Sequence, residues 1–196
     1  MNKIVGLTGG IGSGKSKIIS IFENHGIPCY KSDIKAKKLM INDQNIKKSI
    51  VRLFGKDSYK LNLLNKEYIS EKVFKNKDLL NSLNNIVHPL VKDDFFSWRK
   101  KQNHPFVIIE SAILFQSGFN SFCDKIIFVD CPKEIRIKRV INRDNTLKKN
   151  VLNRINSQET NFDYIKYSDY VVLNINWNKT LKNIKKIYKN LNTECF

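Results

Sequence analysis

The sequence GGIGSGKS at residues 9–16 decides the fold. It fits the pattern G-x-x-x-x-G-K-[ST], with Lys15 and Ser16 at its last two positions. The apolar run KIVGL at 3–7 precedes it and predicts a buried strand. Apolar residues at helical spacing over 16–25 follow it and predict a helix. This pattern indicates a phosphate-binding loop when it lies between a strand and a helix, and both are predicted here.

The chemistry of such a loop follows from its residue types. Glycines allow successive backbone N–H groups to turn inward around phosphate oxygens, and the N-terminus of the next helix adds its dipole. Lys15 is expected to reach the β- and γ-phosphates of a nucleotide, and the Ser16 hydroxyl is expected to hold Mg²⁺. The alternative is a glycine-rich turn without a ligand. The residues predicted to bind ATP in this loop are Gly12, Ser13, Gly14, Lys15, Ser16 and Lys17.

The spacing excludes two other nucleotide-binding classes. A dinucleotide-binding G-x-G-x-x-G would need glycine where Lys15 stands. A GTPase would need an N-K-x-D segment that reads guanine, and the sequence contains none.

Apolar runs and helical patterns alternate along the rest of the chain. They predict an α/β protein with the P-loop NTPase fold, a five-stranded parallel sheet flanked by helices. The strands are expected at 3–7, 27–31, 106–110, 125–130 and 170–174. We expect a helical region over 34–54 with a break near Asn42-Asp43, a helix capped by Asp78, and an interruption of that helix at His88-Pro89.

The polar helical stretches predict insertions within one domain that covers residues 1–196. The core is expected at about 1–59, 105–143 and 168–196. A short chain with a P-loop and two inserted helical stretches suits a small-molecule kinase. The insertion at about 60–104 is expected to bind the molecule that accepts the phosphoryl group, and the one at about 144–167 is expected to close over the site as a lid.

The composition narrows the class of protein further. The 196 residues carry a net charge of +17, which either reflects a Lys-rich composition without function or suits a polyanionic partner. The basic residues are scattered, so nucleic-acid binding is disfavoured. No apolar run is long enough for a transmembrane helix, and the N-terminus lacks the pattern of a signal peptide, so we expect a cytoplasmic protein.

Cysteine spacing gives a further exclusion. The four cysteines form no C-x-x-C pair, which leaves zinc-finger and redox-pair sites without support. Cys195 is expected in a C-terminal tail, and the other three beside apolar runs.

Several segments along nearly the whole chain form a recognisable set. They are IVGLTGGIGSGKS at 4–16, Ser32-Asp33, HPLV at 88–91, IKRVINRD at 137–144, Arg154-Ile155-x-x-Gln158, and Ser168-Asp169-Tyr170-Val171-Val172-x-Asn174. Together they resemble the dephospho-CoA kinase family. The resemblance implies transfer of the γ-phosphate of ATP to the 3′-hydroxyl of dephospho-CoA, the last step of CoA synthesis, with Mg²⁺ as cofactor.

Two carboxylates follow predicted strands. The resemblance places a general base at Asp33, where a carboxylate can accept the proton of the acceptor hydroxyl. The alternative for Asp33 is an N-cap of the next helix. Glu110 ends the strand FVIIE and can hold Mg²⁺ through water, or it is an ordinary carboxylate at a strand end.

The resemblance also implies acceptor-binding residues. His88 falls at a position of the acceptor pocket, although a lone histidine can equally be structural. Residues 112–116 depart from the family's Pro-Leu-Leu-x-Glu, since they read AILFQ and lack both the proline and the glutamate. Gln116 is the residue that would take over the contact of the missing glutamate.

Basic and amide side chains near the C-terminal half complete the predicted site. Arg136, Arg139 and Arg143 share one helical face, which suits phosphate charge in a lid or forms a solvated basic surface. Arg139 and Arg143 match family positions, and Arg136 is expected at the surface. Asn174 ends the last strand, where its amide could read adenine or lie in a turn.

The family pattern has two further differences in this chain. A lid arginine that often follows the position of Gln158 is missing, and Lys166 could replace it only without a bidentate fork. Lys17 stands where threonine is common, but its backbone N–H is retained.

The partners that follow are ATP and dephospho-CoA, with no nucleic acid, no membrane and an open oligomeric state. One alternative is another small-molecule P-loop kinase of the nucleoside or shikimate type. The other is a basic NTPase that binds nucleic acid, which would show steep salt dependence.

Overall fold

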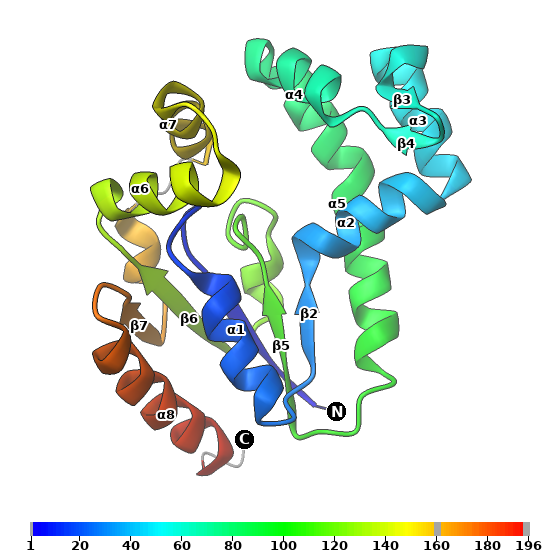
Figure 1. The fold of residues 1–196 in the computed structure, drawn as a ribbon. Helices are drawn as coiled ribbons and strands as arrows, with labels where there is room; N and C mark the ends of the chain where they lie inside the picture. Colours follow the sequence, from blue (N-terminus) through cyan, green and yellow to red (C-terminus); the bar gives the residue numbers. More distant parts are fainter. Residues whose placement is uncertain (1, 159–161, 194–196) are drawn as a thin grey trace. The chain divides into compact units, whose positions relative to one another are not determined.

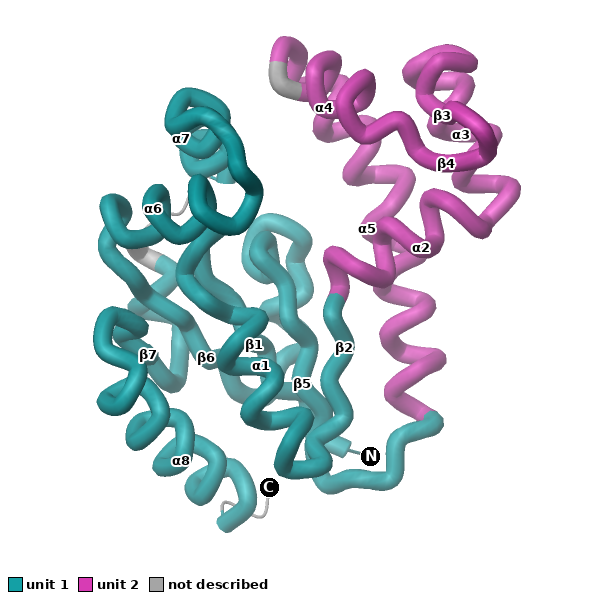
Figure 2. The backbone as a smooth tube through the Cα atoms, viewed as in Figure 1, with its two compact units in different colours: residues 1–31, 101–196 teal, residues 32–100 magenta. Residues whose placement is uncertain are grey.

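The structure is a computed structural model that describes residues 2–158 and 162–193. The chain forms two compact units, drawn in different colours in Figure 2. One comprises residues 1–31 and 101–196, and the other comprises residues 32–100. Cys195 and residues 159–161 of the predicted lid lie outside the described residues.

The first unit is built on a parallel sheet (Figure 1). Its five strands lie in the order β2-β5-β1-β6-β7. Their bounds are β1 Lys3–Thr8, β2 Cys29–Lys31, β5 Phe106–Glu110, β6 Lys125–Asp130 and β7 Tyr170–Leu173. All five lie where the apolar runs predict strands, because a strand buried on both faces reads as a short continuous apolar segment. The predicted P-loop fold with a five-stranded parallel sheet is confirmed.

Helices cover one face of this sheet. The helices of this unit are α1 Lys15–Asn24, α6 Lys133–Asp144, α7 Lys148–Ser157 and α8 Trp177–Thr193, with 3₁₀ helices at Phe119–Phe122 and Phe162–Ile165. Figure 1 shows α1 and α8 in front of the strands. Ile18 and Phe22 of α1 and Ile184 of α8 pack with Val5 and Ile127 of the sheet in one buried core. Burial of this core holds the strand that carries the glycine loop in place.

The opposite face is covered by the segment that follows β5. A Cβ atom on Gly6 would come within 2.7 Å of Leu114 and 2.9 Å of Cys123 Sγ, so that segment packs directly against the backbone of β1. Glycine is therefore needed at this central strand position for close packing.

The second unit is helical with one short hairpin. It contains α2 Ser32–Asn42, α3 Gln44–Phe54, a 3₁₀ helix at Lys56–Ser58, β3 Tyr59–Lys60, β4 Leu63–Leu64, α4 Lys66–Lys75 and α5 Lys77–Arg99. Ile46, Ile50 and Phe54 of α3 form its core with residues of α4 and α5 such as Ile69 and Leu83. The expected break between two helices near Asn42-Asp43 is present, and the Asp43 side chain caps α3 by accepting from the backbone N–H of Ile46 at 3.0 Å.

Three details of this unit differ from expectation. The unit begins at Ser32, not near residue 60, because α3 packs in one core with residues of α4 and α5. The cap of α5 is Asn76, whose Oδ1 accepts from the backbone N–H of Asp78 at 2.9 Å. His88-Pro89 does not interrupt the helix, since α5 continues through Pro89. Proline has no backbone N–H, so the carbonyl one turn before it in the helix loses its donor. Pro89 is exposed, so water can donate a hydrogen bond to that carbonyl instead.

Among the described residues, no helix has both the length and the apolar character that a membrane span requires.

Candidate active site

The glycine loop joins β1 to α1 at the carboxyl end of the sheet. Its backbone has positive φ at Gly12 (78°) and Gly14 (98°), a region that glycine enters without steric cost. A Cβ atom at Gly12 would lie 2.6 Å from the carbonyl oxygen of Arg136, and one at Gly14 would collide with Asn174 Nδ2. Neighbouring side chains and backbone therefore fit against the loop so closely that these positions have to be glycine.

Lys15 starts α1 and is buried, although it carries a charge. Its ammonium group donates to the carbonyl oxygen of Gly9 at 2.7 Å and to that of Gly10 at 3.4 Å. These bonds hold the amine inside the loop, where a phosphate would accept the same protons.

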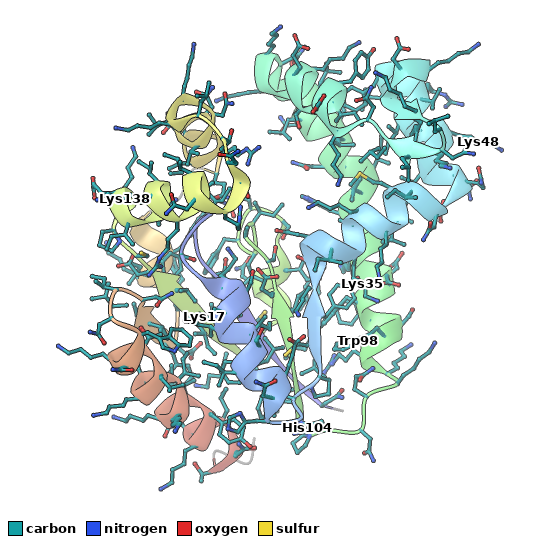
Figure 3. All side chains as sticks on the ribbon, in the orientation of Figure 1. Lys17, Lys35, Lys48, Trp98, His104 and Lys138 are labelled. Carbon is teal, nitrogen blue, oxygen red and sulfur yellow. The ribbon has the colours of Figure 1, made fainter. Side chains whose placement is uncertain are left out.

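Ser16 and Lys17 occupy the first turn of α1 and are exposed. The Lys17 ammonium lies 3.6 Å from the centroid of the Trp177 ring, at the start of α8. Its backbone N–H donates to the Gly14 carbonyl at 3.1 Å. The side chain of Lys17 is thus directed toward an aromatic face, and Figure 3 labels it on α1.

The peptide groups of Ile11, in the middle of the loop, bind two side chains from the distant half of the chain. The N–H of Ile11 donates to Gln158 Oε1 at 2.7 Å, and its carbonyl accepts from Arg136 Nε at 2.9 Å. Arg136 was expected at the surface, and that expectation is wrong. Its guanidinium is partly buried against the loop because the same helical face that carries Arg139 faces it.

Arg139 and Asn174 support the next part of the loop. Asn174 is buried, and its Nδ2 donates to the Ser13 carbonyl at 2.7 Å. Arg139 Nη2 donates to the Asn174 carbonyl at 3.0 Å, and its Nη1 lies 3.4 Å from the Ser13 carbonyl. The amide of Asn174, expected to read adenine, therefore has a backbone carbonyl of the loop as its partner, and a contact with the nucleotide stays a prediction.

Arg143 does not join Arg136 and Arg139 at the loop. Its Nε donates to Asp144 Oδ1 at 2.7 Å, and Arg154 Nη1 donates to the other oxygen of Asp144 at 2.9 Å. The hydrogen bond from Arg143 lowers the pKa of Asp144, with help from the charge of Arg154. This exposed cluster joins the end of α6 to α7, and α7 lies within the range 144–167 where the lid was expected.

Glu110 lies at the last position of β5 and is buried. In the sheet it is paired with Leu7 of β1, just before the glycine loop, and with Lys31 at the end of β2. The strand register thus places this carboxylate at the same end of the sheet as the loop.

Gln116 bonds to the segment that carries Gln158. Its Nε2 donates to the Gln158 carbonyl at 2.7 Å, and the neighbouring Phe115 ring stacks on Tyr164 with centroids 4.3 Å apart. Gln116 was expected to contact the acceptor. The structure gives it a partner in its own unit, and an acceptor contact stays a prediction.

Asp33 and His88 belong to the second unit. Asp33 lies in the first turn of α2, is exposed, and comes two residues after the last residue of β2. Because α2 begins at Ser32, Asp33 is not an N-cap. His88 is half-buried in α5, and burial lowers its pKa.

Sequence reasoning missed the contacts of Arg136 and Gln158 with the loop. The helical spacing of Arg136 and Arg139 contained a signal for the first, since residues at i and i+3 share a face. Gln158 lies 147 residues from Ile11, and local sequence patterns carry no signal for a bond over that distance.

Comparisons with known proteins agree with this geometry. The family model of dephospho-CoA kinase matches residues 3–179. Dephospho-CoA kinase of Porphyromonas gingivalis is 42% identical over 171 residues, which are 87% of this chain and 85% of that one.

Two solved structures have similar folds. Dephospho-CoA kinase from Campylobacter jejuni aligns with a TM-score of 0.70 and 26% identity, covering 97% of this chain and 98% of that chain. The protein TT1252 from Thermus thermophilus aligns with a TM-score of 0.85 and 26% identity, covering 96% of both chains. The glycine loop, the sheet and these matches show that the chain belongs to the dephospho-CoA kinase family.

Proposed function

We propose that the first unit binds MgATP through the glycine loop and that the γ-phosphoryl group passes to the 3′-hydroxyl of dephospho-CoA. Family membership makes the chain an ATP-dependent kinase that phosphorylates dephospho-CoA in CoA synthesis. The observation that carries the proposed placement of ATP is the loop between Thr8 and Lys15, with the buried ammonium of Lys15 inside it.

Phosphate binding in this proposal uses the backbone and one lysine. N–H groups at the start of α1 and within the loop face the incoming oxygens, and the helix dipole favours their negative charge. Lys15 exchanges its bonds to the Gly9 and Gly10 carbonyls for bonds to the β- and γ-phosphates. The exchange keeps the ammonium hydrogen-bonded throughout, so no buried charge loses its partners.

Asp33 is the proposed general base. Its support is its exposed carboxylate in the first turn of α2 and its match to the family position. In the reaction, the bond between the γ-phosphorus and the oxygen of ADP breaks while a bond from phosphorus to the 3′-oxygen forms. The hydroxyl proton passes to Asp33 as this bond develops.

Arginines supply positive charge for the transferred group. Arg139 is held beside the loop by the Asn174 carbonyl, so its charge is available there without rearrangement. Arg143 is proposed to act from the lid, which requires it to leave Asp144. An exposed ion pair of this kind costs little to break.

The donors at this end of the sheet fit Mg²⁺. The Ser16 hydroxyl is exposed at the start of α1, and Glu110 offers a buried carboxylate beside Leu7. Both are oxygen ligands, which Mg²⁺ prefers, and phosphates and water complete its coordination in kinases. Ser16 would hold the ion and Glu110 would act through water, and Mg²⁺ would neutralise charge that develops on the β- and γ-phosphates.

The acceptor contacts proposed for His88 and Gln116 rest on family positions. For His88, burial that lowers the pKa favours a neutral imidazole, which can donate or accept a hydrogen bond. Gln116 has its amide nitrogen on the Gln158 carbonyl, which leaves its side-chain oxygen as the group that could accept from an acceptor.

The proposed setting is the cytoplasm, with ATP and dephospho-CoA as partners and no nucleic acid. The cysteines Cys29, Cys123 and Cys131 are free, which suits a reducing compartment.

The experiment that tests the proposal measures ADP release from MgATP with and without dephospho-CoA, with mass analysis of the product. We expect ADP only when the acceptor is present, together with CoA heavier than the acceptor by one phosphoryl group at the 3′-oxygen. Release that needs a different acceptor, such as a nucleoside or shikimate, would contradict the proposal. Release that rises with added nucleic acid would favour a nucleic-acid-dependent NTPase instead.

A further inference from the structure

Ile11 in the glycine loop is held on three sides by residues from the C-terminal half of the first unit. Its N–H donates to Gln158 Oε1 at 2.7 Å, and its carbonyl accepts from Arg136 Nε at 2.9 Å. Its side chain packs on the apolar cluster of α6 and α7, which includes Val140 and Val151. Both backbone polar groups of one loop residue are thus bound by side chains and not by the loop itself.

The Arg136 guanidinium lies flat against the loop. A Cβ atom on Gly10 would come within 2.5 Å of Arg136 Cζ. Arg136 Nη2 is buried and has no hydrogen-bond partner among the described residues, as is also true of Ser13 Oγ in the same loop. A buried donor without a partner costs free energy, so this arrangement points to a function beyond the stability of the fold.

The backbone of Gln158 is held by a second glutamine. Gln116 Nε2 donates to the Gln158 carbonyl at 2.7 Å, and the Phe115 ring stacks on Tyr164 at an interplanar angle of 6°. This bond needs an amide donor, because a carboxylate at position 116 could only accept and would face another oxygen. The glutamine in place of the family's glutamate therefore has a structural use in this chain.

We propose that Arg136 and Gln158 are positioning residues that keep the glycine loop in its phosphate-binding shape, and that Gln116 acts through Gln158. The inference rests on the proposed binding of ATP phosphates by this loop. A segment with glycine at 9, 10, 12 and 14 has many accessible conformations, and ordering it at the moment of binding would weaken affinity. Fixing the two peptide groups that flank Ile11 beforehand removes part of that entropy cost.

The same contacts couple the loop to α6 and to the end of α7, of which only α7 lies in the predicted lid at 144–167. Arg136 lies on α6, and Gln158 follows α7 directly. The two residues bind the peptide groups on either side of Ile11. Loss of either contact frees this part of the loop, and the second contact then contributes less. The effects of the two substitutions should therefore be less than additive in free energy.

The test compares ATP binding by calorimetry in the full chain and in variants Arg136→Met and Gln158→Met. We expect each to weaken ATP binding by about tenfold, the size of one lost charged or buried hydrogen bond. The double variant should lose clearly less than about a hundredfold, the product of the two single effects. Lys138→Met is the matched control, since Lys138 is an exposed basic residue on the same helix (Figure 3), and it should bind ATP like the unmodified chain.

A kinetic measurement separates positioning from a general structural role. The KM for ATP should rise in both variants, and the KM for dephospho-CoA should stay within about twofold, since the lost contacts hold only the phosphate loop. Gln116→Glu should raise the KM for ATP by a few fold in the unmodified chain and should have no further effect in Gln158→Met. Lower stability alone would not raise the KM for ATP while leaving the KM for dephospho-CoA unchanged.

The outcomes that overturn the inference are distinct from failure of the proposed function. If the unmodified chain does not bind ATP, both fail. If it binds ATP and the folded variants bind equally well, with only a lower melting temperature, the inference alone fails. If Arg136→Met does not fold, Gln158→Met still tests the inference, because it removes the contact with the preceding peptide group at the same loop residue.

Discussion

Asn174 donates from its side-chain amide to the carbonyl oxygen of Ser13 at 2.7 Å, and this bond joins the end of β7 to the glycine loop. Thr180 Oγ1 in turn lies 3.3 Å from Asn174 Oδ1, so the amide is held at both ends. The two linked residues lie 161 positions apart in the chain. The last strand of the sheet thereby contributes to the shape of a loop formed by the first 16 residues.

Replacing Asn174 with alanine should lower both stability and ATP affinity. The Ser13 carbonyl would lose the shorter of its two donors and keep only Arg139 Nη1 at 3.4 Å, a change that costs about 0.5–1.5 kcal/mol. Gly14, whose backbone lies against the amide, would gain freedom, and ATP binding should weaken by about fivefold or more. Thermal unfolding and calorimetric ATP titration would measure both effects.

Asn178→Ala is the matched control for this change, since Asn178 is an exposed asparagine close in sequence in α8. It should leave both quantities unchanged. Equal ATP affinity in Asn174→Ala and Asn178→Ala would show that the amide has no effect on the loop.

Lys15→Met should reduce turnover by at least about a hundredfold, as is typical when a preorganised charge at a phosphoryl group is removed. The melting temperature should change little. Methionine fills the space of the apolar part of the lysine side chain, and the loop keeps its bonds to Arg136 and Asn174. Steady-state ADP release at saturating acceptor and a thermal melt would separate the two. Turnover within about threefold of the unmodified chain would remove Lys15 from the proposed mechanism.

The P-loop and the strand positions could be predicted because their signals are local. The pattern at 9–16 needs only its two flanking elements, and each apolar strand is visible as a short run. Long-range contacts had no such signal. The bonds of Gln158 and Asn174 to the loop depend on how distant segments pack, which periodicity does not encode.

Two misjudged features have physical explanations. Pro89 was expected to interrupt a helix, but on an exposed face the lost hydrogen bond can be replaced by water, and α5 continues. Arg136 was expected at the surface because, unlike Arg139 and Arg143, it matches no family position. Its apolar stem and planar guanidinium instead allow it to lie on a glycine, where no side chain prevents the approach.

Asp33→Asn should reduce turnover by about a hundredfold or more and leave ATP affinity nearly unchanged, since a general base acts on the acceptor and not on the nucleotide. Its effect on stability should be at most about 1 kcal/mol, the loss of one acidic charge in the first turn of α2. Single-turnover transfer, ATP titration and denaturant unfolding measure the three quantities.

Asp43→Ala gives the opposite pattern and serves as the control. The Asp43 side chain caps α3 by accepting from the N–H groups of Asn45 and Ile46, so its loss should cost about 1 kcal/mol of stability. Turnover should be retained. An Asp33→Asn enzyme that is less stable but fully active would mean that Asp33 serves the helix and not the reaction.

Cys29 should make the protein sensitive to alkaline pH. Burial, with help from the charge of Glu23, raises the pKa of this thiol from 9.0 to about 12. In the unfolded chain the thiol loses its proton first, so the folded state binds more protons between about pH 9 and pH 12. The stability that the protonated thiol contributes is therefore fully present below pH 9 and is lost as the pH rises through this range.

Urea unfolding at pH 8 and pH 10.5 should show a smaller loss of stability in Cys29→Ala than in the unmodified chain. Equal losses in the two proteins would mean that the thiol titrates alike in the folded and unfolded states.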